Sequence, residues 1–522
     1  MQRRTFLASA AASLATPALA QPAQVLKAVP QANLTSIDPI WTTANITRNH
    51  GHMVYDTLYG LDGDLAPQPQ MAAGHVVEDD GKRITITLRE GLAFHDGEPV
   101  LARDVAQSIR RWIPRTSYGQ KLGDVLDEVA APDDTQIVFR LKKPFPLLFQ
   151  ALGQVSSACF IMPERVARTD PFKQIDDPTG SGPFMFRKSE YNSGSMVVYE
   201  KNRRYVPRES GTSALIAGPK RAFMDRVEWH IITDAATSAA ALQRGEIDWF
   251  EQPPPEIQEL LQRNRDISIE LIDQRPGCTV LRLNHLHPPF NDKRIRQALL
   301  PAVDQADYMS AVVGPDPTGF RAGIGVFTPD TPMANSAGLE PLTSPRSVER
   351  ARALLREAGY TNQLMRLIGP TDILVPSALT QVAADMFRKL GMNMDFALSD
   401  WGTVVQRRTS REPLDKGGWS ALCTASASFD FVDPAVHSYI RGNGLAAWPG
   451  WPTAPRVEQL RDAWFDAPTL AAQKAIAEDI QRTALDEVTF IPLGAYFNRT
   501  AIRRNLTGRV SGLMLLWNIR RA

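Results

Sequence analysis

The sequence is poor in cysteine, nearly neutral and without a long hydrophobic run. Three cysteines in 522 residues leave at least one without an intramolecular partner, and their spacing matches no zinc or redox motif. Lysine and arginine number 58 against 57 aspartate and glutamate residues, so no overall field favours nucleic acid or an anionic membrane as a partner. No segment of the mature chain approaches the roughly 18 consecutive apolar residues of a membrane helix. We therefore expect neither a nucleic-acid-binding nor a membrane-spanning protein.

The three cysteines, Cys159, Cys278 and Cys423, are best interpreted as small buried hydrophobic residues. A disulfide between Cys278 and Cys423 requires that their strands adjoin, which the spacing does not decide.

The usual catalytic motifs are absent as well. The sequence has no Gly-x-Ser-x-Gly elbow, no phosphate-binding Gly-Lys-Ser/Thr loop, no His-Glu-x-x-His helix and no dinucleotide fingerprint. The close histidine pairs are His50 with His52 and His285 with His287, and neither pair has an acidic residue or a cysteine immediately beside it. We expect no catalytic residues, no bound metal and no cofactor.

The first 20 residues are typical of an export signal. Arg3 and Arg4 precede an alanine-rich stretch, and residues 18–20 form the Ala-Leu-Ala pattern that signal peptidase accepts. The paired arginines favour the twin-arginine route over the Sec route. Because no cysteine follows the predicted cleavage site until Cys159, we expect a soluble periplasmic protein that is not a lipoprotein.

Hydrophobic periodicity predicts an α/β architecture, because apolar residues recur at helical spacing in some segments and alternate with polar ones in others. The predicted helices cover residues 101–112, 344–358, 377–390, 456–465 and 470–485. The predicted strands cover residues 84–88, 364–368, 394–398, 489–496 and 513–517. From residue 344 onward the two types alternate as in βαβ units.

Several blocks of the sequence resemble the bacterial extracellular solute-binding proteins of family 5. The most specific block runs from Leu88 to Val105 and includes His95-Asp96-Gly97, which we interpret as a turn closed by Asp96. Further blocks follow in the order of the family, at residues 55–58, 180–184, 245–248, 289–298 and 354–360. The resemblance covers most of the mature chain.

This resemblance implies a two-lobed, clamshell-like α/β fold of the class II periplasmic binding proteins, with an extra subdomain in lobe one. Lobe one is expected to comprise residues 21–275 and 490–522, with its subdomain at about 50–180, and lobe two residues 276–489. Family members bind a solute between the lobes and deliver it to an ABC permease and its ATPase. These partners, a small ligand and a monomeric state are therefore expected, without nucleic acid.

The resemblance also implies ligand-binding residues. In dipeptide-binding relatives an aspartate that precedes an Asp-Pro turn binds the α-ammonium group of the peptide, and Asp430 matches it, while Asp433 before Pro434 is expected to fix the turn. The other candidates are aromatic residues of lobe two and a loop of lobe one, namely Trp419, Phe429, Phe431, Trp401, Trp41, Thr42 and Asn45. For Trp401, packing in the core is an equally good interpretation.

Two departures from the dipeptide-binding pattern leave the ligand open. The arginine that meets the ligand carboxylate in those relatives corresponds here to Ser377, and the segment 421–428 before Asp430 is longer and richer in small residues. The sequence favours a short peptide or a similar amine-bearing solute. A metal chelate or haem is the alternative that the histidine pairs suggest, and a secreted hydrolase is a third.

Overall fold

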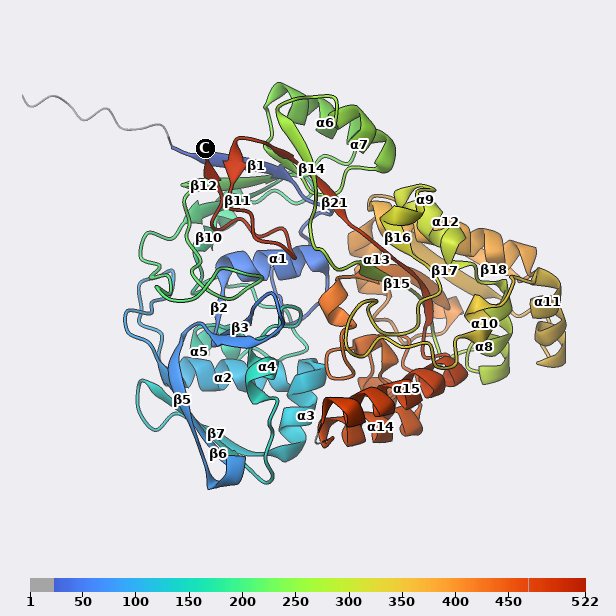
Figure 1. Ribbon diagram of the computed structural model, residues 1–522, viewed down its shortest axis with the longest axis horizontal. Helices are drawn as coiled ribbons and strands as arrows, with labels where there is room; N and C mark the ends of the chain where they lie inside the picture. Colours follow the sequence, from blue (N-terminus) through green and yellow to red (C-terminus); the bar gives the residue numbers. More distant parts are fainter. Residues whose placement is uncertain (1–22, 468) are drawn as a thin grey trace, which may run out of the picture.

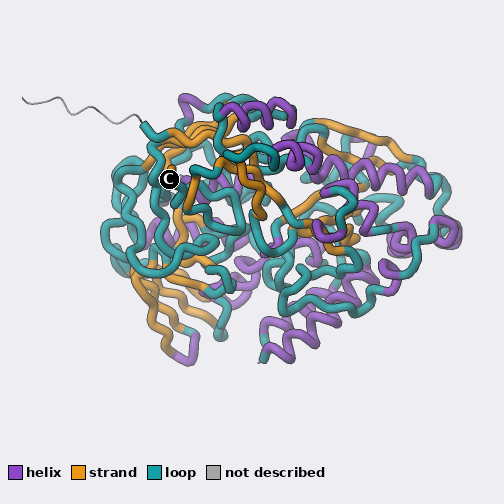
Figure 2. The backbone as a smooth tube through the Cα atoms, turned by 45° about the horizontal axis from the view of Figure 1, so that its top comes forward, coloured by secondary structure: helices purple, strands orange, loops and turns teal. Residues whose placement is uncertain are grey.

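The computed structural model describes residues 23–467 and 469–522, so the predicted signal peptide at 1–20 lies outside the described residues. The chain forms two α/β lobes that lie side by side, each organised around a sheet (Figure 1). Helices and strands alternate through both lobes, with long loops on the surface (Figure 2). Within the described ranges, no helix combines the length and apolar character that crossing a membrane requires.

The first lobe is built on a seven-stranded mixed sheet. Its central strand β1 (Val25–Val29) runs parallel to β12 (Arg226–His230) and to β13 (Trp249–Phe250). The strands that complete the sheet through antiparallel pairs are β10 (Phe184–Phe186), β11 (Met196–Lys201), β14 (Ile267–Leu271) and β21 (Arg499–Arg503). Below this sheet lies α1 (Asn45–Val54), in which residues 46–54 are all buried.

A second, four-stranded antiparallel sheet of the first lobe has the order β5 (Ala72–Glu78), β6 (Arg83–Leu88), β8 (Gln136–Leu141) and β7 (Leu126–Ala130). The amphipathic helix α2 (Ala102–Trp112) buries Val105, Ile109 and Trp112. The strand predicted at 84–88 and the helix predicted at 101–112 are thus confirmed.

The turn between these two elements is built as expected. The carboxylate of Asp96 accepts a hydrogen bond from the amide of Glu98 at 3.2 Å, and Gly97 has a φ of +95°. This positive φ favours glycine, because other residues rarely adopt it.

The second lobe is built on a six-stranded mixed sheet. Its order is β16 (Phe320–Arg321), β20 (Ile491–Tyr496), β15 (Gly277–Leu283), β19 (Ala421–Ser426), β17 (Met365–Pro370) and β18 (Met394–Ser399). The helices around it include α9 (Gln305–Val313), α11 (Val348–Glu357), α12 (Leu374–Lys389), α13 (Trp401–Arg407), α14 (Pro455–Phe465) and α15 (Leu470–Glu487). All the helices and strands that the sequence predicts between residues 344 and 496 are present, with shifted ends.

The chain passes from the first sheet to the second between β14 and β15 and returns between β20 and β21. Strand β20 pairs with β15 and β16, so residues 491–496 lie in the second sheet, although the sequence places the return at residue 490. All six residues of β20 are buried, as is typical of an interior strand in a sheet covered on both faces.

Two local predictions need correction. The helix predicted from Ser344 begins at Val348, because the hydroxyl of Ser347 caps it by accepting a hydrogen bond from the amide of Arg350 at 3.1 Å. The strand predicted at 513–517 is wrong: these residues are buried but form no strand. A short apolar run predicts burial, whereas strand formation also needs a free sheet edge.

Candidate functional site

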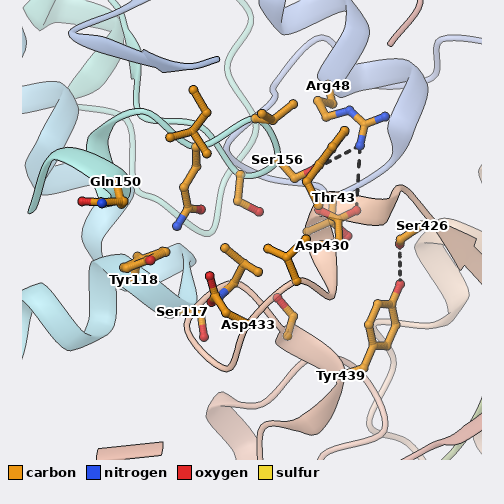
Figure 3. A pocket seen from close by; sticks show the side chains of 18 of the residues that line it. Thr43, Arg48, Ser117, Tyr118, Gln150, Ser156, Ser426, Asp430, Asp433 and Tyr439 are labelled. Atoms are coloured by element: carbon orange, nitrogen blue, oxygen red, sulfur yellow. Dashed lines mark hydrogen bonds and ion pairs between the residues drawn. The ribbon is translucent and has the colours of Figure 1, made fainter. Parts of the chain in front are cut away.

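A cavity lies between the two lobes and is lined by residues of both (Figure 3). Its volume for the centre of a water-sized molecule is about 90 Å³, and the cavity is partly open to solvent. The first lobe contributes Thr43, Arg48 and Ser156, and the second contributes Asp430 and Tyr439. A small ligand bound in this cavity would touch both lobes at once.

Asp430 of the second lobe faces Arg48 of the first lobe across this cavity. Asp430 ends the short 3-10 turn Ser428–Asp430 that follows β19, and Arg48 lies on α1. The Arg48 Nη1 atom is 3.8 Å from the Asp430 Oδ2 atom and donates a hydrogen bond to Ser156 Oγ at 2.9 Å. At 3.8 Å the pair is electrostatic rather than hydrogen-bonded, so the Asp430 carboxylate can still accept a closer donor from a ligand.

Both charges of this pair are largely withdrawn from solvent. Burial raises the pKa of Asp430, and the neighbouring Arg48 guanidinium acts in the opposite direction. Burial likewise lowers the pKa of Arg48, whose Nε atom lacks a hydrogen-bond partner among the described residues. In such surroundings an added charged group of a ligand interacts more strongly than it would in water.

Asp433 has the structural role that the sequence suggests. Its Oδ1 atom accepts hydrogen bonds from the amides of Ala435 at 2.8 Å and Val436 at 3.1 Å, which closes the turn at Pro434. Burial raises the pKa of Asp433, and the residue also lines the central cavity.

The predicted aromatic residues fall into two groups. Phe429 lines the central cavity, where its ring lies 5.3 Å from the Arg48 guanidinium, and Trp401 lines a smaller neighbouring cavity. Trp419 and Phe431 do not line these cavities. Trp419 is fully buried and donates to the carbonyl of Arg408 at 3.0 Å. Phe431 is buried behind Tyr439, with stacked rings 5.3 Å apart.

This placement corrects the interpretation of two candidates. Trp419 and Phe431 support the wall of the site from behind and make no surface for a ligand, because core packing covers both rings. The structure adds Tyr439, which the sequence reasoning missed and which hydrogen-bonds Ser426 at 3.0 Å on the cavity wall.

The loop predicted from lobe one does reach the space between the lobes. Thr42 lines the central cavity, Trp41 lines a larger outer cavity, and Asn45 lines the smaller cavity beside Trp401. Thr43 also touches the second lobe, because its Oγ1 atom accepts a hydrogen bond from Trp448 Nε1 at 3.3 Å.

Further contacts hold the lobes together beside the cavity. Ser117 Oγ, on the helix α3 (Ser117–Val125) of the first lobe, accepts hydrogen bonds from Arg441 at 3.1 Å and from Arg461 at 2.9 Å. Glu458 pairs with both of these arginines, at 3.0 and 2.9 Å. The structure therefore represents a closed arrangement of the lobes.

The histidines of α1 are part of the core. His50 hydrogen-bonds Tyr199 at 3.0 Å and His52 hydrogen-bonds the carbonyl of Val155 at 2.7 Å. Burial lowers the pKa of each to about 3, so both rings are neutral. In the part of the chain that the structure describes, no group of three or more His, Cys, Asp or Glu residues is arranged to hold a metal ion.

The cysteines are free and buried. Strands β15 and β19 do adjoin, but Cys278 lies opposite Ser426 and Cys423 lies opposite Leu281. The strand register thus keeps the two thiols apart, and no disulfide links them.

Two α/β lobes with a charged cavity between them define an extracellular solute-binding protein. The chain belongs to the bacterial extracellular solute-binding proteins of family 5, whose model matches residues 66–439. A probable peptide ABC transporter periplasmic-binding protein of Sinorhizobium fredii is 36% identical over 493 residues, which cover 94% of this chain and 92% of the relative. The glutathione-binding protein GsiB of Salmonella paratyphi A is 29% identical over 518 residues, covering 96% of this chain and 95% of the relative.

Solved structures show the same fold. The binding protein AgaA of A. tumefaciens, in complex with agropinic acid, superposes with a TM-score of 0.79 at 19% identity and covers 95% of this chain and 99% of its own. A dipeptide-binding protein of Pseudoalteromonas, in complex with Met-Leu, gives a TM-score of 0.76 at 21% identity and covers 96% of this chain and 100% of its own.

Proposed function

We propose that this protein is the periplasmic substrate-binding component of an ABC importer and that it carries a short peptide or a similar amine-bearing solute. The observation that carries the proposal is the position of Asp430, a carboxylate of the second lobe in a cavity that faces the first lobe. An ammonium group of a ligand forms charge-assisted hydrogen bonds with such a carboxylate. The names of relatives that carry peptides or glutathione support the same class of ligand.

The proposed mechanism is ligand-dependent closure. A ligand that touches Asp430 on one lobe and residues such as Ser156 on the other binds the closed state more tightly than the open state, and so shifts the population toward closure. The proposed lobes are those expected from the sequence, residues 21–275 and 490–522 against 276–489, except that strand β20 (Ile491–Tyr496) belongs to the second lobe.

The remaining parts of the proposal follow from this mechanism. The closed form is recognised by a membrane permease and its ATPase, the protein acts as a monomer in the periplasm without a lipid anchor, and it performs no chemistry on its ligand. The last point is supported by the family, whose members are solute-binding proteins.

The test compares free peptides with N-acetylated ones. A mixture of dipeptides and tripeptides is expected to raise the melting temperature of the wild-type protein, and acetylation, which removes the ammonium charge, is expected to abolish most of that rise. In Asp430→Asn the free and acetylated mixtures should act alike. Equal stabilisation of the wild-type protein by both mixtures would show that the amine is not bound by Asp430.

A further inference from the structure

Gln154 is a buried glutamine for whose amide nitrogen the protein supplies no acceptor. It follows the helix α4 (Leu148–Leu152) of the first lobe, is 5% exposed and lines the central cavity. Across residues 23–467 and 469–522, its Nε2 atom finds no hydrogen-bond partner. A buried N–H group that makes no hydrogen bond is costly, so this side chain requires an explanation.

The other buried glutamines show how this fold treats a glutamine with a structural role. Gln305 is 3% exposed, and its Nε2 atom donates to the carbonyls of Ile324 at 3.0 Å and Pro492 at 2.9 Å. Its Oε1 atom accepts a hydrogen bond from the amide of Ile324 at 2.9 Å. Gln70 and Gln481 are buried as well, and the Nε2 atom of each donates to a backbone carbonyl. The glutamine that lines the ligand cavity is the exception.

Asp433 of the second lobe offers an acceptor at the same cavity. Both backbone amides that close its turn donate to the Oδ1 atom, so the Oδ2 atom is not used by the turn. Arg461 acts on this carboxylate but is itself paired with Glu458 at 2.9 Å. Tyr118 lies across from Asp433 on the first lobe (Figure 3). Burial raises the pKa of Tyr118, and the Asp433 carboxylate acts in the same direction, so the phenol is neutral.

A carboxamide is the ligand group that Gln154 and Asp433 fit together. Its carbonyl oxygen can accept from the Gln154 amide, while its NH₂ group donates to the Asp433 Oδ2 atom. It also meets either orientation of the Gln154 amide, whose terminal torsion is broad. Other groups fit less well: Asp433 repels a carboxylate, an ammonium group has no acceptor for an N–H donor, and an alkyl group satisfies neither side chain.

We propose that Gln154 and Asp433 bind a neutral carboxamide group of the ligand, while Asp430 binds its amine. This inference rests on the proposed function and narrows its ligand class to amine-bearing solutes that also carry a carboxamide. Gln154 belongs to the first lobe and Asp433 to the second. The carboxamide therefore bridges the lobes and adds to the affinity of the ligand for the closed state.

The first experiment compares dipeptides that differ in one side chain of similar length. Gln-Ala, Glu-Ala and Met-Ala, together with the reversed sequences Ala-Gln, Ala-Glu and Ala-Met, are titrated by calorimetry. In at least one of the two orders, the wild-type protein should bind the glutamine peptide about tenfold more tightly than the other two peptides. Gln154→Leu should bind all three with similar affinity. Binding of these peptides without a preference for glutamine, or an undiminished preference in Gln154→Leu, would overturn the proposal.

A second variant tests the acceptor. In Asp433→Asn the side chain keeps an oxygen for the turn and loses the charge that repels a carboxylate. The discrimination against the glutamate peptides should therefore be largely lost, while that against the methionine peptides remains. Unchanged discrimination against the glutamate peptides would contradict the role of Asp433.

The third experiment needs no ligand and uses Gln305→Leu as the matched control. Removing an amide whose nitrogen has no partner should leave the melting temperature of unliganded Gln154→Leu equal to or above that of the wild-type protein. Gln305→Leu should melt well below it, because three hydrogen bonds to the backbone are lost. A fall in Gln154→Leu as large as that in Gln305→Leu would assign Gln154 a structural role and overturn the proposal.

The failure of peptides as ligands is distinguishable from the failure of the carboxamide site. If none of the six dipeptides binds to the wild-type protein, the peptide part of the proposed function is wrong. Free glutamine, glutamate and methionine at millimolar concentration then test the site directly through thermal shifts. A preference for glutamine that is lost in Gln154→Leu supports the carboxamide site, and equal shifts or no shift with all three amino acids contradict it.

Discussion

At the scale of single residues, Glu251 shows how the closed structure tolerates a buried acid beside the ligand cavity. It follows β13 and is 3% exposed. Its carboxylate accepts hydrogen bonds from the amide of Gln31 at 2.7 Å and from Asn49 Nδ2 at 3.4 Å. These contacts do not compensate for burial, which raises the pKa of Glu251 from 4.5 to about 7.

This shift predicts a pH dependence of stability. The folded protein retains the proton of Glu251 up to about pH 7, whereas the unfolded chain releases it near pH 4.5, so the free energy of unfolding falls as the pH rises between these values. The fall due to this residue should amount to a few kcal/mol, on the order of 1.4 kcal/mol per unit of pKa. In Glu251→Gln this fall should be absent. Denaturant titrations between pH 5 and 8 should therefore show a decrease in the free energy of unfolding that is smaller than in the wild-type protein by about that amount. Identical pH profiles for both proteins would show that Glu251 is ionised in the folded state throughout.

Individual site residues differ in how far the sequence predicts them. Asp430 is found because it lies in a local pattern that resembles the family. Asp433 is found because an aspartate in a turn commonly accepts hydrogen bonds from backbone amides a few residues further on. Arg48 is not found, because an arginine on a helix carries no local sign of a partner in the other lobe. The aromatic residues show the same limit: Trp419 and Phe429 are similar in type, and only the packing separates a core ring from a cavity wall.

At the scale of elements, the start of α11 offers a direct test of how helices of this fold are fixed. Ser347→Ala removes the hydroxyl that accepts from the amide of Arg350, and we expect a loss of about 1 kcal/mol in the free energy of unfolding. Ser344→Ala, at the cap that the sequence suggests, is the control and should cost less than about 0.5 kcal/mol. Denaturant unfolding measures both; a larger loss for Ser344→Ala would place the start of the helix where the sequence predicts it.

Long elements with a clear period are well predicted from the sequence, and short apolar ones are not. Helix α2 and strand β6 carry enough periodic positions to define their type and nearly their ends. The segment 513–517 has no such period, and it packs as buried irregular chain because its position depends on neighbours far away in the sequence. Strand β20 is predicted, but its membership of the second sheet rests on pairing with β15 and β16.

At the scale of the whole molecule, the contacts around Ser117 and the pair of Arg48 with Asp430 form only when the lobes meet. They involve side chains of both lobes around the ligand cavity, so the same closure that surrounds a ligand also forms these contacts. Each contact is too weak alone to hold the lobes closed in water. A ligand that binds the closed state more tightly than the open state provides the remaining free energy of closure. The unliganded protein should therefore be open for much of the time.

The most direct test of this account is small-angle X-ray scattering with and without the dipeptide and tripeptide mixture. We predict that the radius of gyration of the wild-type protein falls when the mixture is added and that the curve then matches the closed arrangement. Asp430→Asn should keep the larger radius at the same peptide concentration. Peptide binding that leaves the wild-type radius unchanged, or an equal contraction in Asp430→Asn, would contradict ligand-dependent closure through Asp430.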